Sequence, residues 1–124
     1  MPLASLDHIT VLCADVDRSR KFYSEVLGMK DGDRPPFDFP GAWLYVGERP
    51  VVHLVGDRNK EGIKTTGSFD HYAFDAKDLI GMRRRLQASG VTFEERAVPG
   101  RPLHQVFIHD PDGVMIELNF RGET

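Results

Sequence analysis

Alternating apolar and polar positions open two similar segments of this chain. The run LDHITVL begins at Leu6 and the run FDHYAFD begins at Phe69, and both contain the dipeptide Asp-His at the same place. Such alternation predicts half-buried β-strands. Each strand is followed by apolar residues at helical spacing, within 16–27 in the first case and 79–86 in the second. The repeated order predicts two copies of one structural unit.

Glycines mark the ends of both predicted helices. Gly28 and Gly90 suit the position after a helix because glycine adopts the left-handed conformation without a Cβ clash. Strand-like runs follow each helix, and a Pro-Asp-Gly turn at 111–113 separates the last two. The predicted strands are 42–46, 51–55, 105–108 and 114–120, with a weak strand at 29–32. The pattern indicates an α+β fold of two tandem βαβββ modules.

We predict one domain with two modules joined by a linker. Module one covers about 1–56, a charged and aperiodic linker about 57–67, and module two about 68–124. Neither four-stranded sheet could bury one face alone, so the modules are expected to pack together within the chain or across a dimer. The Pro-rich segment from Arg34 to Gly41 is a candidate loop over a site.

Composition narrows the function classes. The 124 residues are 40% hydrophobic and 28% charged, with a net charge of −3, which fits a globular domain that has no nucleic-acid partner. Nowhere do eighteen apolar residues follow one another and no signal peptide is recognisable, so we expect a cytoplasmic protein with no membrane partner. The single Cys13 is expected to be a small buried hydrophobe.

Four potential metal ligands fall at matched places in the two modules. His8 and His71 are separated by 63 residues, and His53 and Glu117 by 64. The first pair belongs to the first strand of each module and the second pair to the last strand. Three imidazoles and a carboxylate gathered on one face need a binding partner, because buried polar groups without one are costly. A divalent metal is the simplest partner, and a water-filled cleft is the alternative.

Strand alternation is expected to place these ligands on the polar faces of the sheets. On the first strand Ile9, Val11 and Cys13 form an apolar face, which leaves His8 and Thr10 on the other. The last strand has the apolar face Ile116, Leu118 and Phe120 and the polar face Met115, Glu117 and Asn119. If the apolar faces pack on the helices, all the ligands point to the open faces.

These segments resemble the vicinal oxygen chelate superfamily, which includes glyoxalase I, methylmalonyl-CoA epimerase, extradiol dioxygenases and fosfomycin-modifying thiol transferases. The resemblance runs from LDHITVLCADVDRSRKFYSEVLGM through GAWLYVG and VVHLV to FDHYAF and HDPDGVMIELNF. FYSEVLGM and DPDGVMIEL are its most specific parts. It implies that the modules form a cupped, incomplete β-barrel with helices outside. It also implies that His8, His71 and Glu117 are ligands.

The fourth ligand position differs from that of glyoxalase I. A second carboxylate stands there in that enzyme, whereas this chain has His53. Leu12 and Asp57 stand where bacterial glyoxalase I has an arginine and an asparagine. Three histidines and one glutamate leave a divalent site with one net positive charge, which polarises bound oxygens more strongly. We therefore expect weak or no lactoylglutathione lyase activity.

The resemblance implies a metal-dependent, glyoxalase-like enzyme that chelates two neighbouring oxygens of a small substrate and stabilises an oxyanion or enolate. One divalent metal, which could be zinc, nickel, manganese or iron, is expected per site. Glu117 or a water on the metal is the expected proton carrier. A homodimer is expected because modules of this family are often paired across dimers. The residues expected to contact the substrate are Thr10, Trp43, Met115 and Asn119.

Two alternatives stay open. The segments HIT at 8–10 and DHYAF at 70–74 resemble fosfomycin-type thiol transferases, which use three protein ligands and a basic region after the last strand. Only Arg121 is basic in that region here, which disfavours anion recognition. The second alternative is a drug- or metabolite-binding module similar to the bleomycin-sequestering members. Those members commonly lack the metal ligands, so the four candidates disfavour it.

Overall fold

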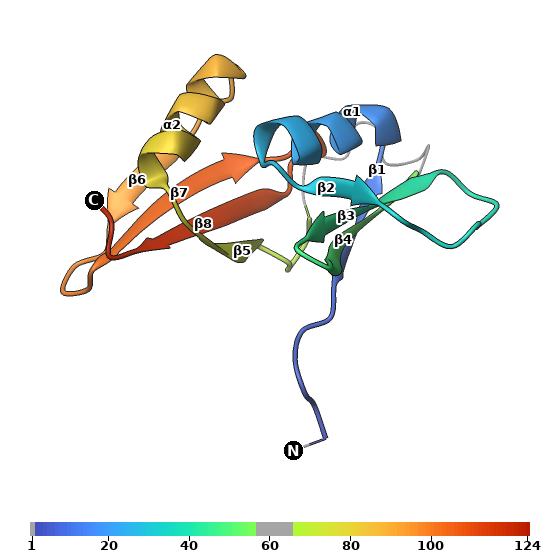
Figure 1. The fold of residues 1–124 in the computed structure, drawn as a ribbon, viewed down its shortest axis with the longest axis horizontal. Helices are drawn as coiled ribbons and strands as arrows, with labels where there is room; N and C mark the ends of the chain where they lie inside the picture. The colour runs from blue at the N-terminus through green and yellow to red at the C-terminus, as the bar shows by residue number, and fades with distance from the viewer. Residues whose placement is uncertain (1, 57–65) are drawn as a thin grey trace. The chain divides into compact units, whose positions relative to one another are not determined.

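The computed structural model describes residues 2–56 and 66–124, which form two βαβββ modules in succession (Figure 1). The chain divides into two compact units, Met1–Ile63 and Lys64–Thr124. Each unit contains one four-stranded mixed sheet. The predicted α+β class and the tandem modules are therefore confirmed. Residues 57–65, which make up most of the predicted linker, lie outside the described residues.

The first module contains a sheet with the strand order β1-β4-β3-β2. Its elements are β1 (Ile9–Cys13), α1 (Val16–Lys21), η1 (Phe22–Val26), β2 (Lys30–Gly32), β3 (Gly41–Val46) and β4 (Arg49–Gly56). β1 runs parallel to β4, and the other neighbours are antiparallel. Helix α1 contacts β3 and β4 and lies over one face of this sheet (Figure 1).

The first predicted helix begins where expected but changes its winding. Asp15 caps α1 by accepting a hydrogen bond from the Arg18 backbone N–H over 3.1 Å. From Phe22 the helix continues as a π-helical turn, in which the Leu27 N–H reaches the Phe22 carbonyl. It ends before Gly28, whose φ of 75° confirms the predicted left-handed terminus.

The second module repeats this order with a sheet β5-β8-β7-β6. Its elements are β5 (His71–Ala76), α2 (Leu79–Ala88), β6 (Glu94–Ala97), β7 (Leu103–His109) and β8 (Met115–Arg121). Gly90 again ends the helix, with a φ of 68°. Strand β6 had no sequence signal, because all four of its residues are exposed and show no alternation. No helix in the described parts of either module is long and apolar enough to cross a membrane.

The predicted division of the strands into two faces is confirmed. Val11 and Cys13 on β1 are buried, with Leu54 on β4, whereas His53 lies on the opposite face. On β8 the buried apolar residues are Ile116, Leu118 and Phe120. The thiol of Cys13 is fully buried in the core, as expected. His53 and Glu117 therefore lie on the sheet faces opposite these apolar residues.

Candidate metal and substrate site

Three residues form one row across the first sheet, on the face opposite its core. Thr10 on β1 lies in register with His53 on β4, which lies in register with Trp43 on β3. The His53 ring is stacked between two others: its centroid is 4.0 Å from that of Trp43 and 3.7 Å from that of His8. The interplanar angles are 13° and 11°. The module thus brings both of its predicted ligands together beside Trp43.

Hydrogen bonds fix which nitrogen of each ring carries the proton. His8 Nδ1 donates to Asp7 Oδ2 over 2.7 Å, so the neutral ring keeps its lone pair on Nε2. His53 Nε2 donates to the Pro50 carbonyl over 3.0 Å, which leaves its lone pair on Nδ1. Partial burial and the adjacent His8 lower the pKa of His53 below 6.5. Both rings can therefore present a lone pair, which a metal ligand requires.

Aromatic surface continues from Trp43 into the Pro-rich loop before β3. The Phe37 centroid is 6.5 Å from that of Trp43 and 5.0 Å from that of Phe39. Arg34 Nη2 donates to the Phe39 carbonyl over 2.9 Å, and the guanidinium lies about 5 Å from both phenyl rings. Phe37 and Phe39 remain 45% and 40% exposed. The loop therefore extends the aromatic surface that leads to His53.

His71 and Glu117 approach each other on the open face of the second sheet. Glu117 on β8 is in register with Ala73 on β5, and His71 lies two residues before Ala73 on the same face. The small Ala73 side chain leaves room for a diagonal contact, in which His71 Nε2 lies 3.4 Å from Glu117 Oε1. The Glu117 side chain is only 13% exposed. This module also brings its two predicted ligands together.

Neighbouring groups fix the direction of both side chains. His71 Nδ1 donates to Asp70 Oδ2 over 2.7 Å, so the neutral ring presents the Nε2 lone pair to Glu117. Asn119 Nδ2 donates to Glu117 Oε2 over 2.9 Å, which leaves Oε1 facing the ring. Two lone pairs then face each other across 3.4 Å. Such an arrangement requires a cation between the two groups or a second proton on the ring.

The two modules hold their candidate ligands in equivalent places. His8 stands two residues before the register partner of His53, as His71 stands two residues before that of Glu117. Ligands about 2.0–2.2 Å from one tetrahedral ion lie roughly 3.4 Å apart, which agrees with the His71–Glu117 spacing. Within each described module the potential ligands come as a pair, and no group of three or more gathers there. Imidazole nitrogen and carboxylate oxygen are nevertheless donor types that divalent metals such as zinc accept.

The residues predicted to contact the substrate lie beside these ligands. Trp43 stacks on one predicted ligand, and Asn119 hydrogen-bonds to another. Thr10 is in register with His53, and Met115 is in register with His71. Leu12, one of the two residues that differ from bacterial glyoxalase I, lies on β1 and is 45% exposed. Asp57 lies outside the described residues.

Sequence reasoning assigned no role to Asp7, Asp70 or Gln105. Both aspartates accept from a predicted ligand, and the repeated Asp-His dipeptide was the signal that could have identified them. Gln105 donates from Nε2 to Asn119 Oδ1 over 3.0 Å. No sequence signal marked Gln105, because strand alternation gives the face of a residue but not its partner.

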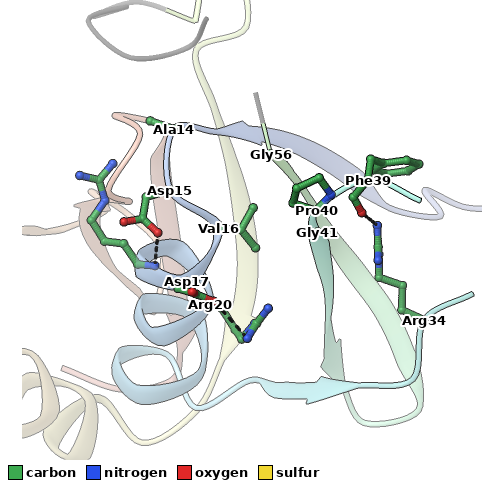
Figure 2. A pocket seen from close by; sticks show the side chains of 11 residues that line it. Ala14, Asp15, Val16, Asp17, Arg20, Arg34, Phe39, Pro40, Gly41 and Gly56 are labelled. Atoms are coloured by element: carbon green, nitrogen blue, oxygen red, sulfur yellow. Dashed lines mark hydrogen bonds and ion pairs between the residues drawn. The ribbon is translucent and has the colours of Figure 1, made fainter. Parts of the chain in front are cut away.

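A pocket of about 700 Å³ opens in the first module at the start of α1 (Figure 2). The loop before β3 and the end of β4 form its other walls. Figure 2 shows Arg34 directed at the Phe39 carbonyl, so these two residues belong both to this pocket and to the aromatic surface. None of the four predicted ligands lines this pocket. It is therefore distinct from the candidate ligand pairs.

Comparison with known sequences gives a consistent result. Residues 5–118 match the Glyoxalase/Bleomycin resistance protein/Dioxygenase superfamily. The chain is 34% identical to glyoxylase I 4 of Arabidopsis thaliana, over 94% of this chain and 70% of that protein. It is 31% identical to a probable lactoylglutathione lyase of Vibrio parahaemolyticus, over 90% and 86%. It spans half the length of the Schizosaccharomyces pombe lactoylglutathione lyase, with 30% identity.

Solved structures share the fold over nearly the whole chain. A glyoxalase/dioxygenase from Nostoc punctiforme superposes with a TM-score of 0.79 at 22% identity, covering 98% of this chain and 94% of that one. The fosfomycin resistance protein FosX from Listeria monocytogenes superposes with a TM-score of 0.75 at 16% identity, covering 95% and 93%. The sequence match and the shared fold lead to one conclusion: the chain belongs to the glyoxalase/bleomycin resistance protein/dioxygenase superfamily.

Proposed function

We infer that this chain is a divalent-metal-dependent enzyme of the glyoxalase type, acting on a small substrate with two neighbouring oxygen atoms. The observation that carries the proposal is the pair His71 and Glu117, whose Nε2 and Oε1 atoms lie 3.4 Å apart. A hydrogen bond to Asp70 orients the His71 ring, and a hydrogen bond from Asn119 orients the Glu117 carboxylate. The names of two relatives that the chain covers to 70% and 86% of their length, glyoxylase I 4 and a probable lactoylglutathione lyase, support a lyase or isomerase reaction.

His8, His71 and Glu117 would hold the metal, with His53 as the fourth candidate. Asp7 and Asp70 support both first-strand histidines, because an acceptor on Nδ1 fixes the tautomer and makes Nε2 a better ligand. Zinc, nickel, manganese and iron all suit these donors. When bound, such a metal supplies a Lewis acid that polarises the substrate oxygens and stabilises negative charge on them.

We propose that Glu117 moves a proton at the substrate. Asn119 occupies its Oε2, so Oε1 is the oxygen presented to the site. A carboxylate in that position can take a proton from a carbon next to a carbonyl and return it to a neighbouring atom. Trp43 offers a flat apolar wall beside the His8–His53 pair, which would hold an apolar part of the substrate and exclude water.

One observation favours the second candidate function, thiol transfer of the fosfomycin type. His53 donates to Pro50 and lies parallel to His8, and parallel stacked rings do not direct their lone pairs to one point. His53 would have to leave this stack to become a ligand. If it stays, three protein ligands remain, the number that the resemblance assigns to the fosfomycin-modifying transferases.

A substrate screen with reconstituted protein separates these functions. Chelated protein is loaded with zinc, nickel, manganese or iron(II) and given hemithioacetals of 2-oxoaldehydes, or fosfomycin with a small thiol. Metal-dependent isomerisation supports the first proposal, and metal-dependent opening of the epoxide supports the second. Turnover that is equally fast in chelated protein contradicts both. The homodimer and the cytoplasmic location stay predictions, and sedimentation analysis tests the former.

A further inference from the structure

A continuous chain of hydrogen bonds leads from β6 to Glu117 within the second module. Arg96 Nε donates to Gln105 Oε1 over 2.9 Å, and Gln105 Nε2 donates to Asn119 Oδ1 over 3.0 Å. Asn119 Nδ2 then donates to Glu117 Oε2 over 2.9 Å. The strands set this path, because Arg96 is in register with Gln105, and Gln105 with Asn119. Three neighbouring strands thus contribute one polar row on the face that carries Glu117.

Chemistry at the two ends fixes the direction of every bond in this row. Arginine only donates, so Gln105 must turn its oxygen towards Arg96 and its amide nitrogen towards Asn119. Asn119 must then accept with its oxygen and donate with its nitrogen. A carboxylate only accepts, and Glu117 receives this last N–H. Reversal of either amide would bring two acceptors or two donors together.

The direction of these hydrogen bonds matters because both amides are buried. Gln105 and Asn119 are 7% and 9% exposed, so water is largely excluded from replacing a lost partner. Arg96 lies at the outer end of the row, on the edge strand β6, with its guanidinium 5.4 Å from the Phe107 ring centroid. An exposed cation therefore determines the orientation of two buried amides.

We propose that Arg96 is a positioning residue that acts through Gln105 and Asn119 to determine which oxygen Glu117 presents beside His71. With Oε2 held by the amide, Oε1 alone faces His71 Nε2. Without the row, the Asn119 amide can turn its oxygen towards the carboxylate, and Glu117 then turns away or presents both oxygens. The significance of this oxygen for metal binding rests on the proposed function.

The sharpest test changes the direction of the row while preserving its shape. Gln105→Glu keeps an acceptor for Arg96 but replaces the amide donor that faces Asn119. We expect the affinity of the metal-free full chain for Zn²⁺, measured by calorimetric titration, to fall about 10- to 100-fold, the usual effect of removing a partner behind a ligand. Arg96→Ala removes the source of the direction and should give a smaller loss. Arg96→Lys retains a donor and should stay within about threefold of the unchanged protein.

A purely structural role of Arg96 in anchoring β6 is tested with a matched control. Arg83 on α2 pairs with Glu95 on β6 over 2.7 Å, one residue from Arg96 and outside the row. Arg83→Ala should therefore weaken the attachment of β6 and lower the melting temperature, yet leave the Zn²⁺ affinity unchanged. Equal Zn²⁺ affinities of the unchanged protein, Gln105→Glu and Arg96→Ala would overturn the proposal, as would an equal loss in Arg83→Ala.

A second readout needs no metal and separates this proposal from the proposed function. The side-chain amide resonances of Asn119 in ¹⁵N-labelled, metal-free protein report its partners, and Asn119→Asp assigns them. We expect these resonances to move in Arg96→Ala and to return towards their original positions in Arg96→Lys. If the unchanged protein binds no Zn²⁺, the proposed function fails. The shift of the Asn119 resonances still tests whether Arg96 acts through this row. If the Asn119 resonances do not move in Arg96→Ala, the positioning role of Arg96 is overturned, whether or not metal binds.

Discussion

His71 and Glu117 are diagonal neighbours on β5 and β8, with Nε2 and Oε1 separated by 3.4 Å. The other hydrogen-bonding atom of each group is already occupied, His71 Nδ1 by Asp70 and Glu117 Oε2 by Asn119. His71 Nε2 and Glu117 Oε1 are therefore directed at the same space, because Asp70 and Asn119 hold the opposite atom of each group. This relationship underlies both the metal proposal and the separate role given to Glu117.

Loss of Glu117 should differ from loss of a histidine ligand. His71→Ala removes a neutral ligand, so its rate should recover in part with excess metal. Glu117→Gln keeps the shape of the side chain but removes its charge and its basic oxygen. At metal saturation it should stay about 10²- to 10⁴-fold slow, the usual loss when a general base is removed. Steady-state rates across a metal titration measure both effects. Equal rescue of the two variants would remove Glu117 from proton transfer.

The aspartates before the histidines should influence metal affinity without touching the metal. Asp70→Ala frees His71 Nδ1, so the ring can change tautomer and orientation. We expect metal affinity to fall about 10- to 100-fold, measured by competition with a chromogenic chelator. Asp75→Ala is the control, because Asp75 lies on β5, the strand that begins at His71, and pairs with exposed Arg121 instead. If both variants bind metal like the unchanged protein, Asp70 does not influence metal binding through His71.

Sequence alone predicted most of the fold because its signals were local. Apolar alternation identified β1 and β8, and Gly28 and Gly90 marked the helix ends through their left-handed conformation. Strand β6 and the π-helical turn were missed, since neither carries a distinctive pattern of apolar residues. In both cases hydrogen bonds to neighbouring segments or turns define the element.

The candidate site was predictable only in part, for a similar reason. Equal spacing in the two repeats predicted the four candidate ligands, and the strand register agrees with the face expected for His53 and Glu117. The stack of His53 on Trp43 and the path from Arg96 to Asn119 depend on cross-strand register. Register is set by pairing between distant parts of the chain, which one sequence does not reveal.

The stacked His53 predicts a pH dependence of the metal-free protein. Partial burial and the adjacent His8 lower its folded-state pKa below the ordinary 6.5. The unfolded chain therefore takes up this proton at a higher pH, so neutral His53 favours the folded state above about pH 6.5, and this contribution is lost as the pH falls through the folded-state pKa. Melting temperatures from about pH 7.5 to 5 should decline less in His53→Gln. A His53 resonance that titrates at or above pH 6.5 would contradict this account.

His53 also predicts a limit on glyoxalase activity. The methylglyoxal–glutathione hemithioacetal should be converted slowly or not at all, because an imidazole stands where glyoxalase I has its second carboxylate. His53→Glu should raise the rate if this carboxylate is the main deficiency. The assay follows formation of the thioester with the protein saturated in nickel or zinc. Turnover by the unchanged protein on the order of 10⁴ M⁻¹s⁻¹ or higher would show that the substitution matters little.

Metal stoichiometry tests the central claim most directly. The chain is stripped with a chelator, reconstituted with one divalent metal at a time near pH 7, separated from free metal and analysed for its elements. We predict about one bound metal per chain, because the four candidate ligands fall at matched places in the sequence repeat. Replacing His8 and His71 together should abolish binding while circular dichroism shows an intact fold. Metal retained in full by that folded double variant would contradict the assignment of these residues as ligands.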